Sequence, residues 1–517
     1  MPPADDRGHA GSPATGRSVD GDELPGRAIS PWLDGEEPPP RPSLRGTARA
    51  DVCVVGAGII GIATACELAE RGLDVAVLEA GRIGHGVTGN TTAKLSSLQG
   101  LKYGPLSSRF GRESAAAYAE ANEVGIASIA GLVDKYSIDC DFRRTANFTY
   151  ADSETHRDSI EEEVEAAANA GLPVGYTEET GLPWQVAAAV RCEEQAEFHP
   201  HRFVLALAAA LERRGARIHE RTRATGLSGG AVVAESGAVE AEHVVLATHL
   251  PFLDRGGYFA RTHPERSYAL AARVASEPPQ GMYLSTEQPA HSIRPFELDG
   301  EALLLVGGEA HKAGQGNPAD RYRALERFAR ERFDVASVEY RWAAHDNMSA
   351  DGLPLIGRLW PFSDRLWAAT GMGKWGLALG VCAGQMLADG ICGREHRLAH
   401  IFTPMRLNAR AALPTLISEG ADVGMRLLGD RIRRRGTRDR IASGAGAVVG
   451  DGRGQRAVYR DESGRLHELS ARCTHLGCIV GWNSADRSWD CPCHGSRFDP
   501  LGEVIHGPAV APLSRLE

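Results

Sequence analysis

The feature that most constrains this chain lies near its C-terminus, where cysteine and histidine recur in two short boxes. The first box is Cys473-Thr-His475-Leu-Gly-Cys478, and the second is Cys491-Pro-Cys493-His494-Gly-Ser496. A Cys-x-His pair places its two side chains on two neighbouring irons more easily than on one metal ion, and zinc sites usually begin with two closely spaced cysteines. The boxes therefore favour a cluster of two irons, with a zinc site as the alternative.

The order Cys-x-His and then Cys-x-x-His resembles the Rieske iron–sulfur proteins. The resemblance implies a [2Fe–2S] cluster with two cysteine ligands on one iron and two histidine ligands on the other. It assigns Cys473 and Cys491 to the buried iron and His475 and His494 to the outer iron. The exposed imidazoles of the two histidines would then pass electrons to an external partner.

The same resemblance implies roles for four further positions. Cys478 and Cys493 match the pair that forms a disulfide between the two cluster loops of respiratory-type Rieske proteins. Ser496 matches a hydroxyl donor to a bridging sulfide, which raises the reduction potential. Phe498 stands where the highest-potential members carry tyrosine. We therefore expect a potential below the top of the Rieske range of ~−150 to +300 mV.

A second site is indicated near the N-terminus by a glycine-rich turn between a strand and a helix. The apolar run 51–55 reads as a buried parallel strand, and the turn is Gly56-Ala57-Gly58-Ile59-Ile60-Gly61. A helix follows, ended by Gly72, and a second strand, 75–78, leads into Glu79 and Ala80. The glycines permit a tight turn and close approach to a pyrophosphate, while the acid binds ribose hydroxyls. The pattern predicts a dinucleotide.

FAD is favoured over NAD because residues 80–335 contain no second glycine fingerprint for a nicotinamide nucleotide. Later segments resemble the D-amino-acid oxidase/glycine oxidase superfamily, and the chain most resembles bacterial FAD oxidoreductases fused to a C-terminal Rieske domain over nearly its whole length. Residues 351–357 share this resemblance. It also implies that FAD is contacted by Thr91, Thr92, Ala93, Lys94, Thr248, Gly371, Gly373, Lys374, Trp375 and Gly376.

The predicted fold class is α/β, with a Rossmann-like FAD domain and an α+β substrate domain, followed by a small all-β Rieske domain. The oxidoreductase is predicted over 49–407, with its FAD part at about 49–100, 196–250 and 351–405 and its substrate part at about 140–195 and 255–345. A disordered tail is predicted over 1–48 because proline, glycine and aspartate are frequent there. A helical linker is predicted over 408–440 and the Rieske domain over 441–517.

Bulk properties exclude two classes of partner. The chain has 517 residues and a net charge of −10, which argues against nucleic acid. No apolar stretch approaches the ~20 residues that a membrane helix needs. The first 48 residues lack the apolar segment of a signal peptide, and the scattered cysteines outside the two boxes favour a cytoplasmic protein.

The resemblance also implies an activity. Enzymes of this superfamily usually remove a hydride from a C–N bond, and the flavin carries the chemistry. We therefore expect a dehydrogenase that oxidises a small amine or amino-acid-like substrate and passes electrons singly through the cluster to an external one-electron acceptor. Two alternatives stay open: a reductase with reverse electron flow, and a non-catalytic electron-transfer or redox-sensing protein.

No residue is fixed as catalytic by the sequence. Arginine and tyrosine are candidates for holding a substrate carboxylate, since a guanidinium matches a carboxylate bidentately. Lys374 could stabilise charge on the reduced flavin, histidines could act as bases, and His85 lies near the region where some relatives attach FAD covalently. The arginine and tyrosine candidates are Arg261, Arg294, Tyr258 and Tyr268, and the histidines are His249, His311 and His345.

Overall fold

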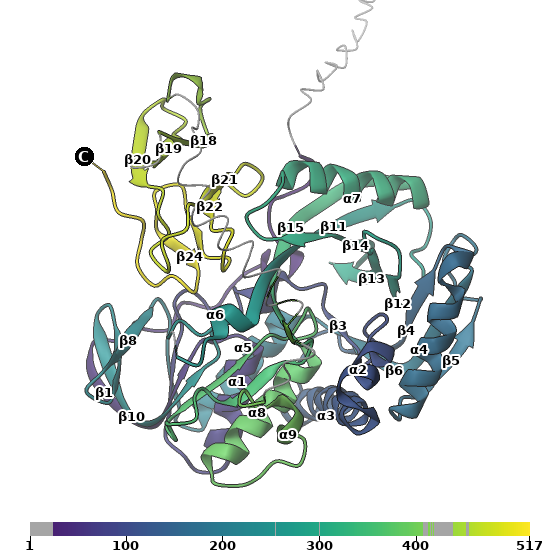
Figure 1. The fold of residues 1–517 in the computed structure, drawn as a ribbon, viewed down its shortest axis with the longest axis horizontal. Helices are drawn as coiled ribbons and strands as arrows, with labels where there is room; N and C mark the ends of the chain where they lie inside the picture. The colour runs from purple at the N-terminus through teal and green to yellow at the C-terminus, as the bar shows by residue number, and fades with distance from the viewer. Residues whose placement is uncertain are drawn as a thin grey trace, which may run out of the picture.

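The computed structural model describes residues 24–253, 255–298, 300–406, 438–450 and 454–516, with isolated positions at 412, 413, 415 and 417. These residues form two large sheets flanked by helices and a small all-β C-terminal domain (Figure 1). The predicted fold class is confirmed. The predicted helical linker lies outside the described residues, apart from the isolated positions and a short turn at Arg438–Arg440. No helix in the described ranges is long and apolar enough to cross a membrane.

The eight-stranded sheet holds the nucleotide fingerprint. Its main strands pair in parallel, so their carboxyl ends meet at one edge, where ligands of open α/β sheets bind. The antiparallel β16 forms one edge, and the hairpin of β8 and β9 adds beside β10. The order is β16 (Leu355–Arg358), β17 (Leu366–Thr370), β10 (Gly237–Leu246), β1 (Gly46–Val55), β2 (Val75–Leu78) and β7 (Arg217–His219), plus β8 (Ala224–Ser228) and β9 (Ala231–Ala234).

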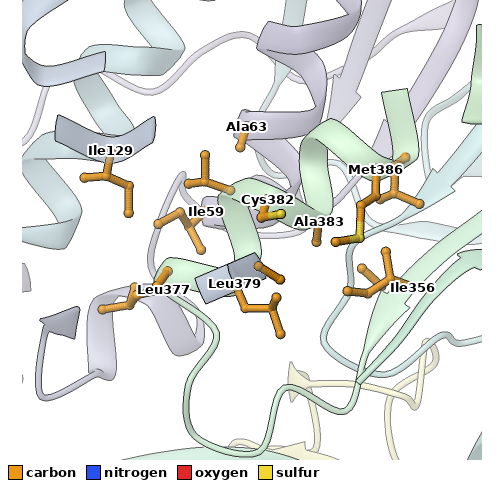
Figure 2. Packing of buried hydrophobic residues seen from close by; sticks show 14 of the residues in the cluster. Ile59, Ala63, Ile129, Ile356, Leu377, Leu379, Cys382, Ala383 and Met386 are labelled. Atoms are coloured by element: carbon orange, nitrogen blue, oxygen red, sulfur yellow. The ribbon is translucent and has the colours of Figure 1, made fainter. Parts of the chain in front are cut away.

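Helices α1 (Ile59–Glu70), α3 (Arg112–Tyr136), α5 (Pro200–Arg213) and α8 (Ala378–Ile391) build the core around this sheet. Small residues let α8 approach its neighbours: a Cβ on Gly384 would lie 2.9 Å from Thr64 N, and one on Gly125 1.9 Å from Ala378 O. Figure 2 shows side chains from α1, α3 and α8 meeting there. Gly111, at φ 86°, separates α3 from the preceding α2 (Tyr103–Phe110).

The nine-stranded sheet is mainly antiparallel and contains the predicted substrate segments. Helix α7 (Pro318–Arg332) lies against β11 and β14, and α4 (Arg157–Asn169) lies against β5 and β6. The order is β15 (Val335–Ser349), β11 (Thr262–Val274), β14 (Glu301–Lys312), β13 (Ser292–Leu298), β12 (Met282–Ser285), β4 (Arg143–Ala151), β6 (Ala188–Glu197) and β3 (Lys94–Leu95), with β5 (Val174–Thr177) on β6. Because β3 follows the fingerprint half in the chain, it ties the two sheets together.

The prediction of a disordered tail over residues 1–48 is wrong for residues 24–48. Trp32, in a short 3-10 turn (Pro31–Leu33), is buried and its Nε1 donates to the Thr91 carbonyl oxygen at 2.7 Å. Leu44 is also buried, just before β1. The polar composition of the segment concealed these two anchors. Residues 1–23 lie outside the described part of the chain.

The C-terminal domain consists of two small antiparallel sheets around a core that includes Trp489 and Phe498. The first cluster box lies between β20 and β21, and the second lies between β22 and β23. The strands are β18 (Gly446–Val449), β19 (Arg456–Arg460) and β20 (Leu466–Ser470) in one sheet, and β21 (Gly481–Asn483), β22 (Ser488–Asp490), β23 (Arg497–Phe498) and β24 (Val504–His506) in the other.

This domain is docked on the β15–β11 edge of the nine-stranded sheet (Figure 1). Arg266 on β11 is buried and forms ion pairs with Asp486 and with Asp490, the latter at 3.5 Å. Arg497 pairs with the same two carboxylates at 3.3 and 3.1 Å. A second contact joins the FAD part, where Arg223 Nη2 donates to the Val504 carbonyl oxygen at 2.8 Å.

Candidate functional site: a shared cavity and a cluster site

A cavity of about 710 Å³ lies at the carboxyl edge of the parallel strands. Its wall is built from the fingerprint turn, the loops after β2 and β10, six strands of the nine-stranded sheet and the turn before α8. Residues 504–510 of the C-terminal domain complete the wall. The volume lies in the range of ordinary ligand pockets, and both domains therefore shape it.

The fingerprint turn is shaped for close approach of a ligand. Gly56 has φ +103°, and a Cβ there would lie 2.4 Å from Ala247 O. A Cβ on Gly61 would lie 1.9 Å from Gly56 O, so helix α1 can meet the turn only with glycine here. Gly58 caps α1, and its neighbours Ile59 and Ile60 line the cavity. The positive end of the helix therefore faces the space where a pyrophosphate would lie.

Glu79 is fixed at the cavity wall by the backbone of the same turn. Its Oε2 accepts from Ala57 N and its Oε1 from Gly81 N, both at 2.8 Å. Burial raises the pKa of this carboxyl, and the two N–H donors oppose that shift. The arrangement fits an acid that binds ribose hydroxyls.

Most of the predicted FAD contacts line the cavity, while four do not. Ala57, Gly61, Ala93 and Gly371 are absent from its lining and belong to the backbone that supports it. The residues that line it are Gly56, Gly58, Ile59, Ile60, Glu79, Ala80, Thr91, Thr92, Lys94, Thr248, Gly373, Lys374, Trp375 and Gly376. The glycine cradle, the helix terminus and the acid together fit FAD.

Two titratable side chains face this cavity from buried positions. Lys94 Nζ donates to the Tyr283 carbonyl oxygen at 3.0 Å and to Ser292 Oγ, and burial lowers the pKa of Lys94 to about 7. Burial raises the pKa of Asp346 to about 6. Sequence reasoning missed Asp346, because a single acid in a strand carries no motif.

Three of the predicted substrate-binding residues are not in the lining of the cavity, which corrects that prediction. Arg294 Nη1 donates to the Ala93 carbonyl oxygen at 2.6 Å, so it supports the FAD loop. Tyr258 donates to the Leu359 carbonyl oxygen at 3.0 Å, and Arg261 donates to that of Pro404 at 2.7 Å. These side chains are buried or partly buried against backbone acceptors, where they stabilise the fold.

The other candidates lie at or near the cavity. Tyr268 lines it, and its hydroxyl lies 2.9 Å from His311 Nε2. Lys374 also lines it and pairs with Glu265 at 2.9 Å. His85 lines it and contacts Glu37 of the N-terminal segment.

The cluster boxes bring the four predicted ligands together. Cys473 and Cys491 are buried, and the rings of His475 and His494 lie 5.0 Å apart between centroids. Among the described residues, His494 Nδ1 is buried without a hydrogen-bond partner, as expected of a nitrogen that binds a metal. The donor set of two thiols and two imidazoles fits a Rieske cluster.

The supporting residues of the cluster site are also in place. Cys478 and Cys493 form a disulfide, with Cα atoms 6.6 Å apart. Ser496 Oγ accepts from Ala509 N at 3.0 Å. The expectation that both histidines are exposed is wrong for His494, which is 4% exposed and lies against Phe259.

Comparison with known families identifies the two halves of the chain. The family described as FAD dependent oxidoreductase matches residues 51–390, and the Rieske [2Fe-2S] domain matches residues 439–517. The chain belongs to the FAD dependent oxidoreductase family and carries a C-terminal Rieske domain. Its cofactors are FAD and a [2Fe–2S] cluster, and the zinc alternative is set aside.

Individual relatives agree with this assignment. The chain is 35% identical over 493 residues to the putative Rieske 2Fe-2S iron-sulfur protein YhfW of Bacillus subtilis, covering 94% of this chain and 97% of the relative. It is 25% identical over 376 residues to the gamma-glutamylputrescine oxidoreductase of Escherichia coli, and the match covers 69% of this chain and 87% of the relative. Glycine oxidase from Geobacillus kaustophilus shares the fold, with a TM-score of 0.58 and 22% identity, over 70% of this chain and 99% of that one.

Proposed function

We propose that this protein is a dehydrogenase that oxidises a C–N bond of a small amine or amino-acid-like substrate. Electrons would leave FAD one at a time through the Rieske cluster to an external acceptor. The observation that carries the proposal is a cavity of about 710 Å³ whose wall comes from both the FAD fold and the Rieske domain. Relatives whose names refer to glycine and to gamma-glutamylputrescine support the substrate class.

The chain's own residues supply what an amine substrate needs. FAD would supply the hydride acceptor when bound, and the protein would orient the substrate and accept its proton. Asp346 is an acid at the cavity wall that would attract the ammonium group of the substrate. Lys94, with its pKa near 7, would take the ammonium proton, because only the neutral amine gives up hydride readily.

The two cluster histidines differ in exposure, which supports one place for the contact with an external electron-transfer partner. His494 is buried against the oxidoreductase, whereas His475 is half-buried beside Leu476, which is 39% exposed. An external acceptor would therefore approach at His475. Reverse flow, from a reduced carrier through the cluster to the flavin, would use the same surface and is the alternative that the experiment decides.

The test is an anaerobic titration followed by substrate screening. The holoprotein is titrated with dithionite while visible and EPR spectra are recorded, and then mixed with a panel of amines and amino acids. We expect one class of amine to bleach the flavin and to produce the EPR signal of the reduced cluster. Rapid reduction of oxygen by substrate-reduced enzyme whose cluster stays oxidised would contradict the proposal. A cluster potential far below the Rieske range would favour reverse flow.

A further inference from the structure

Three histidines from separate segments meet at the boundary between the two domains. His249 follows β10, His345 lies on β15 and His506 ends β24 of the Rieske domain. The ring centroids of His345 and His506 are 4.8 Å apart, and those of His249 and His506 are 5.1 Å apart. His249 Nδ1 and His506 Nε2 are within hydrogen-bond distance at 3.1 Å. The three rings are thus in continuous contact.

One end of this histidine group touches the cluster loop. A Cβ placed on Gly495 would lie 2.2 Å from His345 Cε1 and 2.3 Å from its Nε2. The His345 ring therefore lies directly on the backbone that follows the cluster ligand His494. Only a glycine at position 495 leaves room for this contact.

The other end of the group opens on the flavin cavity. His249 and His506 both line that cavity. His249 has φ 66°, an uncommon conformation for a residue with a side chain. It is held there by Thr370 Oγ1, which donates to its carbonyl oxygen, and by Asn347 Nδ2, 3.3 Å from its Nδ1. Strain of this kind is typical of functional positions.

We propose that His345, His506 and His249 are the contact through which electrons pass between the flavin and the cluster. The inference rests on the proposed function, because it assumes that the two cofactors exchange electrons. Each transfer takes one electron from the reduced flavin and turns one ferric iron of the cluster ferrous. The external one-electron acceptor then reoxidises the cluster, so that a second transfer can return the flavin to its oxidised form while its protons leave to solvent. His345 is a positioning residue here, since it lies between the two sites.

The test measures this internal transfer without any substrate. The anaerobic holoprotein is reduced at the flavin by a light flash with a deazaflavin donor, and cluster reduction is followed by absorbance and freeze-quench EPR. In the His345→Ala protein, we expect the transfer to slow by an order of magnitude or more. His345→Gln, which fills more of the gap, should give an intermediate rate. His506→Ala, which removes the ring that joins His345 to His249, should slow the transfer in the same way.

A matched control separates this role from ordinary packing. His291 directly precedes β13, and its ring stacks on Phe328 with ring centroids 3.7 Å apart, outside the histidine group. His291→Ala should therefore leave the rate unchanged. FAD content, the two midpoint potentials and the EPR g-values are compared in every variant. Wild-type rates in both His345→Ala and His506→Ala, at unchanged potentials, would overturn the inference. Failure of the wild-type flavin to reduce the cluster would overturn the proposed function instead.

Discussion

Gly61 lies where helix α1 leaves the fingerprint turn, and its surroundings leave no room for a side chain. A Cβ would lie 1.9 Å from Gly56 O, so Gly61→Ala must push the helix away from the turn. Overpacking of this kind costs about 1–3 kcal/mol. We expect the purified variant to hold much less FAD, measured as flavin released per mole of protein.

A glycine in another helix provides the control for that substitution. Gly131 lies in α3, and, apart from its chain neighbours and the backbone of its own helix, no atom lies within 4 Å of the position its Cβ would take. Gly131→Ala should keep the wild-type FAD content and gain about 0.5–1 kcal/mol of stability, because alanine favours the helix. Equal FAD content in the two alanine variants would contradict the role assigned to Gly61.

Lys94 should make the stability of the protein depend on pH in a defined window. Its pKa is about 7 in the folded protein, against about 10.4 in an unfolded chain. Below pH 7 both states bind the proton, and the folded state carries the full cost of a buried ammonium. Between about pH 7 and about pH 10.4 the unfolded state binds more protons than the folded state. The free energy of unfolding therefore rises with pH, by at most about 1.4 kcal/mol per pH unit.

The variant Lys94→Met lacks this titration and reveals it by comparison. It should exceed the wild type in melting temperature most clearly at pH 6, and the difference should shrink as the pH approaches 10. Differential scanning fluorimetry of both proteins across that range measures the effect. A melting difference that is constant with pH would show that Lys94 is not neutralised near pH 7.

At the scale of elements, strand β11 carries the main electrostatic anchor of the Rieske domain. Arg266→Ala leaves the buried Asp490 and the partly buried Asp486 with Arg497 as their remaining arginine partner. Breaking a buried ion pair costs about 3–5 kcal/mol. We expect the two halves to separate on size exclusion after cleavage at a protease site inserted between residues 420 and 430. The cleaved wild type should elute as one species.

The same strand offers a surface arginine as the control. Arg273 pairs with Glu301 and is 42% exposed, and exposed pairs contribute about 0–1 kcal/mol. Arg273→Ala should therefore stay associated after the same cleavage. Separation in both variants, or in neither, would contradict a specific role for Arg266.

The elements that sequence analysis found are those whose signals are local. The strand at 51–55, the glycine turn and the strand at 75–78 are adjacent in the chain, and β1, α1 and β2 confirm them. Trp32 was missed because its burial depends on Phe296 and Thr91, far away in sequence. The sequence offers His345 only as a candidate base, because no residue adjacent to it in the chain indicates that Gly495 of the Rieske domain packs against its ring.

At the scale of the whole molecule, FAD should hold the two domains together. Residues 504–510 form part of the wall around the cavity, so a ligand there contacts both halves. A ligand at a hundredfold excess over its dissociation constant stabilises the bound state by about 2.7 kcal/mol. Removing FAD should make the cleaved protein separate at lower urea concentrations than the holoprotein. Restoring FAD should reverse the change, and an identical urea midpoint with and without FAD would contradict it.

The C-terminal position of the Rieske domain was readable from the sequence, but its docking was not. The two boxes allow the four cluster ligands to be predicted from the sequence, because each cysteine–histidine pair lies within one short segment. The contacts between Arg223 and Val504, or between His249 and His506, join residues more than 250 positions apart. Neither pair forms a pattern in a single sequence, so the shared cavity emerged only from the structure.

Pro508 and Val510 of the electron-carrying domain border the same cavity as the FAD fold, so the sequence of this domain cannot diverge independently of the oxidoreductase part of the chain. In the function proposed above, a substitution in this segment changes both the electron carrier and the wall of the cavity that takes the substrate. Exchange of the Rieske module between relatives would therefore transplant part of a substrate preference along with an electron carrier. Residues 504–510 are therefore positions at which substitutions can be tested for a change of substrate specificity, although they belong to no flavin-binding motif.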